Sequence, residues 1–408
     1  MLAPMAPRHV ELLVVGGGLA GTTLALAAAS AGIVTALVER AAPGTLLAAP
    51  YDGRTTAIAW GSQLIFRALG FWSAVEADAS PIREIRVADG GSRLFLHYDH
   101  ALVGDHPLGF IVENRVLRRA LLERCRALPN LVHLAPMALE RVEYEAGAAR
   151  AFLADGSVIC AALVAAADGK DSPLRTAAGI RTIRWSYPQT AIVCTVKHAK
   201  PHRGVAVEHF LPAGPFAILP MTGDRSSIVW TEASALAPRL IAASESDFHD
   251  ELARRFGDHL GALAVEGPRW SYPLSFLFAT RTTAPRLALV GEAAHLIHPI
   301  AGQGFNLGIR DIAALAETIV DARRLGLDIG AGAVLRRFEA ARQLDAALLG
   351  TVTDGLNRLF SNDAGPLRLA RDLGLAAVDR TPPLKRLFMR HAMGTYGNLP
   401  RLARGERL

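Results

Sequence analysis

The stretch RLALVGEAAHLIHPIAGQGFNLGIRD, residues 286–311, contains an apolar run, a loop and the start of a periodic pattern. The run from Arg286 to Val290 predicts a short buried strand, and the pattern after Gly304 predicts a helix. We expect no regular structure between them. Gly302 and Gly304 let backbone N–H groups approach a ligand closely, and the N-terminus of the following helix favours negative charge there. The arrangement suits a ring system that acquires negative charge; an ordinary strand, loop and helix is the alternative.

A second glycine-rich stretch, VGGGLAG at 15–21, follows an apolar run near the N-terminus. We expect a strand over 11–15, a turn over 16–21, a helix over 24–31 and a strand over 34–38, as in dinucleotide-binding folds. In such a turn Gly16 makes the tight bend and Gly18 lets the backbone meet a pyrophosphate. Gly21 lets the helix pack closely on the strand, and the Glu39 carboxylate can accept hydrogen bonds from ribose hydroxyls. The spacing does not separate FAD from NAD.

The same region imitates a membrane span, because residues 12–38 carry no charge. Its five glycines would interrupt such a helix. Glu11 and Glu39 bracket it where a signal peptide would have basic residues and a cleavage site. We therefore expect neither a span nor a signal peptide.

A third stretch, LVAAADGKDSPLRTAAGI at 163–180, ends an apolar run at Asp168-Gly169 and continues with Ser172 and Arg175. A surface turn is the alternative for Asp168-Gly169 alone. The spacing DGxxSxxR, together with residues 286–311, resembles the ubiquinone-biosynthesis hydroxylase family of FAD-dependent aromatic monooxygenases. In that family the corresponding run reads GDAAH…P.AGQG.N.G.RD, and the fold is like that of para-hydroxybenzoate hydroxylase.

The resemblance implies specific cofactor contacts. Arg54 lies near the flavin, Arg115 reaches the pyrophosphate, and Arg118 and Arg119 form a solvated face; water exposure is the alternative for Arg54. Asp168 caps its turn and contacts the cofactor, and Arg175 supplies a cation nearby. Residues 302–304 line the pyrimidine edge, Pro299 packs beside the reactive ring, and Glu292, in place of the commoner Asp, reaches a ribityl hydroxyl. The full implied cofactor-binding set is Gly16, Gly18, Gly21, Glu39, Arg40, Arg54, Arg115, Asp168, Gly291, Glu292, Pro299, Gly302, Gln303, Gly304 and Asn306.

The chemistry follows from the cofactor, because the sequence lacks a Ser-His-Asp signature, HExxH, a Walker loop and a second GxGxxG. The resemblance implies that FAD, reduced transiently by NAD(P)H, reacts with dioxygen to a flavin hydroperoxide that hydroxylates a polyprenylated phenol in ubiquinone biosynthesis. His295 and His298 are candidates for a general base, but His295 matches a family histidine that we interpret as structural. No catalytic residue is assigned. A non-catalytic flavoprotein subunit that binds other quinone-biosynthesis enzymes, a reductase and, less well supported without WxWxIP, a halogenase are the alternatives.

We expect an α/β fold in which a Rossmann-like FAD-binding domain is interleaved with a β-sheet substrate domain, followed by C-terminal helices. The FAD-binding domain takes residues 1–79, 107–181 and 281–330. The substrate domain takes a hairpin at 80–106 and a sheet at 182–280, and residues 331–408 are helical.

Several elements are predicted within these segments. Residues 51–72 predict a loop leading to a helix whose apolar face includes Ile58, Leu64, Ile65 and Leu69. Residues 81–100 predict a hairpin turning at Gly90-Gly91. Helices are expected over 114–128 and 247–256, and strands within 131–158 and over 190–196, 205–211, 216–220 and 226–230.

Composition bounds the remaining possibilities. The 408 residues are 51% hydrophobic, enough for two or three globular domains. The three cysteines are far apart and form no metal-ligand spacing, which predicts a reduced cytoplasmic setting without zinc or iron–sulfur. The net charge of +6 belongs to residues 366–408, which hold nine Lys or Arg and three Asp or Glu. We expect no nucleic-acid partner.

The basic tail contains a predicted amphipathic helix that starts at Pro382-Pro383. One face is expected to carry Leu384, Leu387, Phe388, His391 and Ala392, and the other Arg386 and Arg390. Since a prenylated phenol resides in the bilayer, this helix is a candidate for reversible binding to an anionic membrane surface, on the inner face of the cell membrane. Packing of its apolar face against the protein is the alternative.

Overall fold

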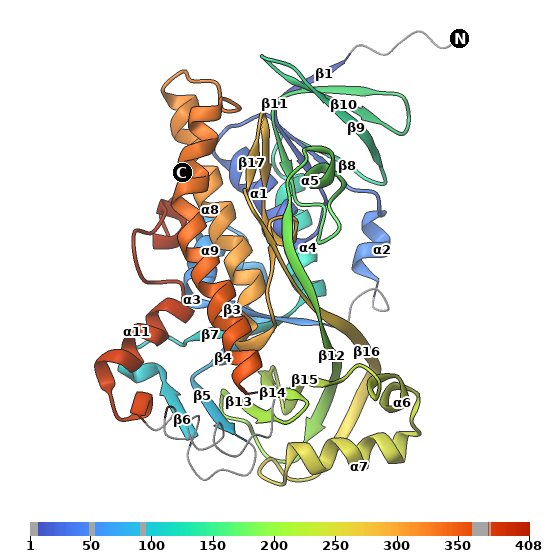
Figure 1. Cartoon of the computed structure of the whole chain (residues 1–408), viewed down its shortest axis with the longest axis vertical. Coiled ribbons are helices and arrows are strands. Elements are labelled where there is room, and N and C mark those ends of the chain that lie inside the picture. The colour runs from blue at the N-terminus through green and yellow to red at the C-terminus, as the bar shows by residue number, and fades with distance from the viewer. Residues whose placement is uncertain (1–6, 49–53, 90–94, 361–373, 375–376) are drawn as a thin grey trace.

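The computed structural model describes residues 7–48, 54–89, 95–360, 374 and 377–408. Two large sheets lie one above the other, and the long helices α8 (Gln303–Arg324) and α9 (Gly332–Phe360) run beside them (Figure 1). The predicted α/β fold with a Rossmann-like part and a second sheet is confirmed. The Gly90-Gly91 turn lies outside the described residues.

The first sheet contains the dinucleotide-type unit. Its strands follow the order β17-β18-β11-β1-β2-β8, and β10 and β9 extend it from β11. The strands from β18 to β8 along this path are parallel, so their carboxyl ends share one edge. The bounds are β1 (Arg8–Val15), β2 (Thr35–Val38), β8 (Leu131–Leu134), β9 (Leu139–Tyr144), β10 (Ala149–Leu153), β11 (Val158–Ala166), β17 (Thr283–Ala284) and β18 (Leu287–Leu289).

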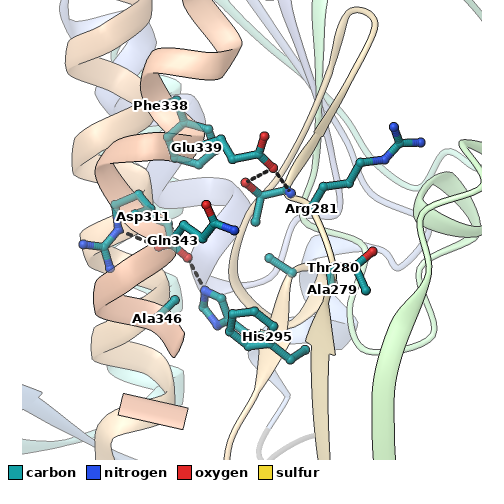
Figure 2. A pocket seen from close by; sticks show the side chains of 13 residues that line it. Ala279, Thr280, Arg281, His295, Asp311, Phe338, Glu339, Gln343 and Ala346 are labelled. Atoms are coloured by element: carbon teal, nitrogen blue, oxygen red, sulfur yellow. Dashed lines mark hydrogen bonds and ion pairs between the residues drawn. The ribbon is translucent and has the colours of Figure 1, made fainter. Parts of the chain in front are cut away.

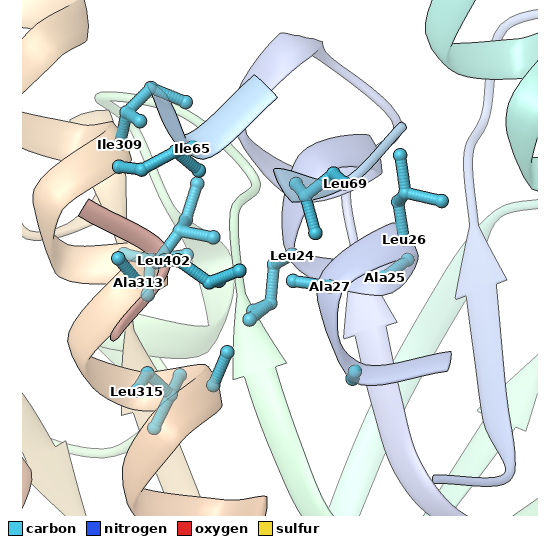
Figure 3. Close-up of a cluster of buried hydrophobic side chains, with 14 of the residues drawn as sticks. Leu24, Ala25, Leu26, Ala27, Ile65, Leu69, Ile309, Ala313, Leu315 and Leu402 are labelled. Carbon is cyan, nitrogen blue, oxygen red and sulfur yellow. The ribbon is translucent and has the colours of Figure 1, made fainter. Parts of the chain in front are cut away.

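The largest apolar core lies between this sheet and its helices. Helix α1 (Leu19–Ser30) is buried along most of its length because small residues let it pack between the sheet, α4 (Asn114–Arg126) and α8. Figure 3 shows α1, α3 (Trp60–Ala68) and α8 meeting around Leu24, Ile65 and Ile309, with Leu402 between them. Leu402 belongs to the 3₁₀ helix η6 (Arg401–Arg404) and is 1% exposed, so the C-terminal segment completes this core.

The second sheet follows the order β19-β16-β12-β15-β14-β13-β5-β6. Helices α6 (Ala237–Ala242) and α7 (Glu245–Phe256) cover the lower face of this sheet (Figure 1) and bury Ile192, Phe216 and Trp230. The predicted hairpin forms its edge and pairs with β13. The bounds are β5 (Glu84–Asp89), β6 (Phe95–Asp99), β12 (Thr182–His198), β13 (Val205–Leu211), β14 (Gly214–Met221), β15 (Arg225–Ala233), β16 (Leu263–Ala279) and β19 (His295–Leu296).

A third, small sheet was not predicted. It consists of β3 (Thr55–Ala59), β7 (Gly109–Glu113) and β4 (Ser80–Ile82). The expected loop before α3 is therefore wrong in part: Ile58 lies in β3 and pairs with Phe110 instead of lying on the helix. The expected hairpin also begins later, at Glu84, because Ser80–Ile82 pairs with β7. The six-segment division of the chain stays a prediction.

Three further α-helices are short: α2 (Pro43–Leu47), α5 (Pro173–Ala177) and α11 (Pro382–Ala392). The alternative for α11, in which its predicted apolar face packs against the protein, is wrong. Lys385 and Met389 are buried, whereas Leu384, Leu387 and Phe388 are 37%, 39% and 44% exposed. The inward face is selected by Met389, which packs with Met393, and by an ion pair of 2.8 Å between Lys385 Nζ and Asp379.

A chain of buried polar side chains joins residues 286–311, called the central stretch from here on, to the long helices α8 and α9. His295 Nε2 lies 2.5 Å from Asp311 Oδ2, and Arg342 Nε donates to Asp311 Oδ1 at 2.8 Å. Figure 2 shows His295 pointing at Asp311 beside a small pocket between α8, α9 and β16. Burial alone would raise the pKa of Asp311, but His295 and Arg342 together hold it below its ordinary value. His295 is thus structural, as predicted.

Asp311→Asn should destabilise the fold by about 3–5 kcal/mol, because it removes the buried negative charge that faces both His295 and Arg342, although Asp345 still pairs with Arg342. The measurement is urea unfolding with excess FAD present. Asp250→Asn is the matched control, since the side chain of Asp250 is 74% exposed and its loss should cost less than about 0.5 kcal/mol. Equal unfolding midpoints for the two variants would contradict the role given to Asp311.

Candidate functional site

The glycine turn at residues 16–21, called the first glycine turn from here on, is crowded on its protein side and open at the start of α1. A Cβ at Gly21 would lie 1.8 Å from Gly16 O, and one at Gly16 would lie 2.3 Å from Ala167 O. A Cβ at Gly18 would meet no atom within 4 Å, and no side chain caps the helix there. The exposed N-terminus of a 12-residue helix therefore suits a phosphate group.

Glu39, which follows β2, holds this turn in place by two hydrogen bonds. Its Oε2 accepts a hydrogen bond from Gly17 N–H at 2.6 Å, and its Oε1 accepts one from Ala41 N–H at 2.7 Å. Each carboxylate oxygen keeps a second lone pair, so ribose hydroxyls can still donate to it. Arg40 is exposed beside Glu39. The contacts of both residues with a cofactor stay predictions.

Residues 163–180, which carry the DGxxSxxR motif and are called the third signature from here on, lie beside the first glycine turn. Asp168 Oδ2 accepts a hydrogen bond from Leu174 N–H at 3.3 Å, while its buried Oδ1 has no partner among the described residues. Burial raises the pKa of Asp168, against hydrogen bonds from Ser172 and Leu174. An orphaned buried oxygen at the carboxyl end of β11 is where a ligand hydroxyl would be accepted.

Arg175 lies close enough to Asp168 for its charge to act against the raised pKa of that carboxyl, and its place beside the cofactor stays a prediction. Its guanidinium is buried and donates to Lys170 O at 2.7 Å and to Ala293 O at 2.9 Å. Ala293 belongs to the 3₁₀ helix η4 (Gly291–Ala293), so Arg175 ties the third signature to the central stretch. It is a positioning residue.

The central stretch is more regular than expected. Besides η4 it contains β19, which pairs with β16, and the 3₁₀ helix η5 (Ile300–Gly302). Gly291 and Gly302 have left-handed backbones, with φ of 59° and 62°. A Cβ at Gly291 would lie 3.3 Å from Ala20 of the first turn, and one at Gly302 would lie 2.8 Å from Ala57 of β3. The glycines thus let the first turn, the central stretch and β3 converge.

Some side chains near these glycines form hydrogen bonds within the protein, and others are exposed. Asn306 donates to Ala57 O at 2.8 Å and Gly302 O at 3.0 Å and accepts from Ala59 N–H at 2.9 Å. Both its N–H donors are therefore used within the protein, where they hold the loop, and its contact with the cofactor stays a prediction. Glu292 and Pro299 are exposed between buried neighbours. They face outward from the loop and stay predicted cofactor contacts.

The start of α8 leaves its backbone accessible to a ligand. No side-chain cap satisfies its first turn, which begins at Gln303. A Cβ at Gly304 would meet only Ile297 Cγ1, at 3.8 Å. The N-terminus of this 22-residue helix thus presents N–H groups that would stabilise negative charge on a ring placed beside them.

Two predicted arginines lie near the start of α4. Arg54 O accepts a hydrogen bond from Asn114 N–H at 3.1 Å, and the Arg54 guanidinium lies 4.9 Å from the centre of the Tyr272 ring. The side chain of Arg115 is 49% exposed. Arg118 is 8% exposed, so its expected place on a solvated face is wrong. Since Asn114 and Arg118 are one helical turn apart and both buried, this spacing was the available signal for an inward arginine.

The convergence of these groups suits FAD. The helix N-termini of α1 and α8 offer N–H donors to a pyrophosphate and to a ring, and Asp168 offers an unpaired oxygen between them. Among the residues that the structure describes, no cluster of three His, Cys, Asp or Glu could hold a metal ion. The site lies where parallel strands end, the usual place for a dinucleotide.

Known proteins share both fold and sequence with the chain. The family model described as FAD binding domain matches residues 9–324. Ubiquinone hydroxylase UbiL of Rhodospirillum rubrum is 52% identical over 98% of this chain and 94% of its own length. The 3-demethoxyubiquinol 3-hydroxylase of Escherichia coli is 34% identical over 96% of this chain and 100% of its own length. The structure of p-nitrophenol 4-monooxygenase PnpA of Pseudomonas putida matches in fold, with a TM-score of 0.79, 18% identity and coverage of 96% and 100%.

Fold and site together define an FAD-dependent monooxygenase. Similarity to curated relatives over nearly the whole chain narrows this class. The chain belongs to the hydroxylase family of ubiquinone biosynthesis, which confirms the resemblance seen in its motifs.

Gly18→Val should abolish FAD binding without unfolding the protein. The valine side chain meets no protein atom near Cβ, but it occupies the space in which the pyrophosphate would approach the start of α1. We expect the purified variant to be colourless and to keep the far-UV circular dichroism of the wild type. Gly147→Val, at another glycine whose Cβ would meet nothing within 4 Å, should keep its FAD. Full FAD occupancy in the Gly18 variant would remove this turn from the site.

Proposed function

We propose that the protein uses NAD(P)H and dioxygen to hydroxylate the aromatic ring of a polyprenylated phenol in ubiquinone biosynthesis. The names of two relatives, a ubiquinone hydroxylase and a 3-demethoxyubiquinol 3-hydroxylase, support a quinone precursor as the substrate. The observation that carries the proposal is the open N-terminus of α8, whose Leu307 packs with Tyr187 and Phe276 of the second sheet.

Bound FAD would supply the electron transfer and the activation of oxygen. The residues of the chain hold the ring system and enclose it. The N–H groups at the start of α8 stabilise negative charge, and Asp168 accepts a ligand hydroxyl. Since the protein itself does little covalent chemistry, its contribution is to position the phenol and to exclude water.

The second sheet provides the apolar surface for that purpose. Ile297 packs with Tyr187 and Phe276 of this sheet, and Ile300 packs with Phe210. Thr55 Oγ1 donates to Ser227 Oγ at 2.9 Å, which joins β3 to β15. The central stretch therefore rests on the upper face of the second sheet, and we place the substrate ring between them.

The outer surface of α11 supports binding at a membrane. Leu384, Leu387 and Phe388 are exposed, and Arg386 and Arg390 lie among them on the same helix. Apolar side chains flanked by cations fit an anionic bilayer surface, where the isoprenoid tail of the substrate would reside. Within the described residues, no helix combines the length and the apolar character needed to cross a bilayer. We propose peripheral contact through α11, and protein partners from quinone biosynthesis are the alternative occupants.

The activity predicts that the FAD-loaded protein oxidises NAD(P)H faster when a prenylated phenol is present. One oxygen atom from ¹⁸O-labelled dioxygen should appear in the product, which mass spectrometry detects. Stimulated NAD(P)H consumption with only hydrogen peroxide as product would contradict hydroxylation of that phenol. Bound FAD without any stimulated oxidation would favour a non-catalytic flavoprotein subunit.

The double variant Leu387→Asp, Phe388→Asp should weaken binding to anionic liposomes by about tenfold or more, since burying each side chain contributes about 1.5 kcal/mol. Co-sedimentation at low and high salt measures the binding. The apparent KM should rise for a long-tailed phenol and stay unchanged for a short-tailed one. Leu325→Asp is the control, because Leu325 is 73% exposed on another part of the surface. Unchanged sedimentation of the α11 double variant would assign this surface to a protein partner. Deleting residues 382–408 is not a suitable test, because it would also remove Leu402 from the core.

A further inference from the structure

Strand β13 presents alternate residues to two different layers. Val207 packs into the core between the second sheet and α7. Ala206 and Phe210 point the other way: Ala206 packs with Met389 and Met393, and Phe210 packs with Ile300 of the central stretch and Phe360 of α9. Glu208 lies between Ala206 and Phe210, so period-two alternation places it on the same upper face. This carboxylate therefore faces the layer in which we place the substrate ring.

The surroundings of Glu208 are apolar. On the neighbouring strands it lies opposite Ala217 of β14 and Val87 of β5. Within the part of the chain that the structure describes, no hydrogen bond or ion pair reaches its side chain, which keeps some accessible surface. Burial raises its pKa to about 7. An unpaired carboxylate in such a place opposes folding, so a functional role is the better explanation.

Other titratable groups near this face are engaged or distant. Asp89 is buried opposite Phe210 at the end of β5. Burial, and after it the charge of Asp379, raises the pKa of Tyr98 on β6 to about 12. On α11, Lys385 pairs with Asp379. None of these groups is a cation that neutralises Glu208.

Two further titratable side chains lie on the central stretch and on α9. His298 is fully buried, and burial lowers its pKa to about 4, so it stays neutral. On α9, Asp354 accepts a hydrogen bond from Tyr187 at 2.8 Å and pairs with Arg358. Among the residues that the structure describes on this face, Glu208 is thus the unpaired acid whose pKa lies near neutral.

We propose that Glu208 is the catalytic base that accepts the proton of the substrate's phenolic hydroxyl. The O–H bond breaks, its electron pair stays on the phenol oxygen, and the proton forms a neutral carboxylic acid with Glu208; no electron is transferred. The resulting phenolate is richer in electrons at the ortho and para carbons, where an electrophilic oxygen adds. A phenol has a pKa of about 10, so a base with a raised pKa accepts its proton more readily than an ordinary carboxylate does. The inference rests on the proposed function.

Glu208→Gln tests the inference because it keeps the shape and removes the base. In the FAD-loaded enzyme we expect kcat to fall by about 10²–10⁴-fold with a prenylphenol. In the wild type, kcat/KM should rise with pH through about 7, because Glu208 acts as a base only when it is ionised. The Glu208→Gln variant should not show this rise of kcat/KM with pH. Glu208→Asp should recover part of the rate.

Two further measurements separate a catalytic from a structural role. A bound nitrophenol should absorb as the phenolate in the wild type and as the neutral phenol in Glu208→Gln at the same pH, with no turnover needed. The variant should be at least as thermally stable as the wild type at pH 8, because an acid whose pKa is raised by folding destabilises the protein above that pKa. Glu266→Gln is the matched control: its 40% exposed carboxylate loses its charge beside Lys197 and Arg225, Arg225 keeps Glu113 as a partner, and none of these values should change.

The outcomes are distinct. If the wild type hydroxylates the phenol and Glu208→Gln keeps its rate, its rise of kcat/KM with pH and its phenolate absorbance, the assignment of Glu208 is overturned and the proposed function stands. If the wild type turns over no phenol, but its nitrophenol absorbance depends on Glu208, the proposed function fails and the proton-accepting site remains. A variant that unfolds at pH 8 would show a structural role and overturn the assignment.

Discussion

The close approach of backbone segments around the first glycine turn is the constraint on which the rest of the structure depends. The Cβ positions of Gly16 and Gly21 are taken by backbone oxygens, and Gly291 stands against Ala20 of the same turn. Gly308 of α8 in turn lies so close to Gly291 that a Cβ there would be 3.1 Å from its Cα. Because these segments have no intervening side chains, β1, β11 and β18 bring α1, Asp168 and α8 to one site. Each glycine excludes alternatives by sterics, which few side-chain contacts do as strictly.

Buried polar contacts then hold the parts that glycine brings together. Arg175 joins the third signature to η4, Asn306 joins α8 to β3, and the His295–Asp311–Arg342 chain joins β19 to α8 and α9. Since β19 also pairs with β16, the second sheet is attached to the same stretch. Glu208 differs from these residues, because its carboxylate has no protein partner among the described residues to satisfy it. Like the buried Oδ1 of Asp168, it is an unpaired polar group in a place where a ligand can bind.

Local steric requirements could be predicted from the sequence, and long-range packing could not. The glycine turns, the dinucleotide-type unit and the strands of the second sheet have short-range patterns, and they were predicted. Thr55–Ala59 forms a strand only because β7 lies beside it, and β7 is far away along the chain. Periodicity places Leu384, Leu387 and Phe388 on one face of α11, but it could not show that Met389 and Lys385 would face inward and leave those three exposed. Arg118 and the direction of Glu208 likewise depend on which layer covers their element.

The docking of η6 has a consequence for how the protein is made. Leu402 fills the space between α1, α3 and α8, so a core that begins with Leu24 is finished by a residue near the other end of the sequence. During translation this core stays open until residue 402 has left the ribosome, although the first glycine turn emerges among the earliest segments. Closing so long a loop costs chain entropy before the contact rewards it, which slows folding. Until η6 docks, the apolar faces of α3 and α8 that it contacts stay exposed.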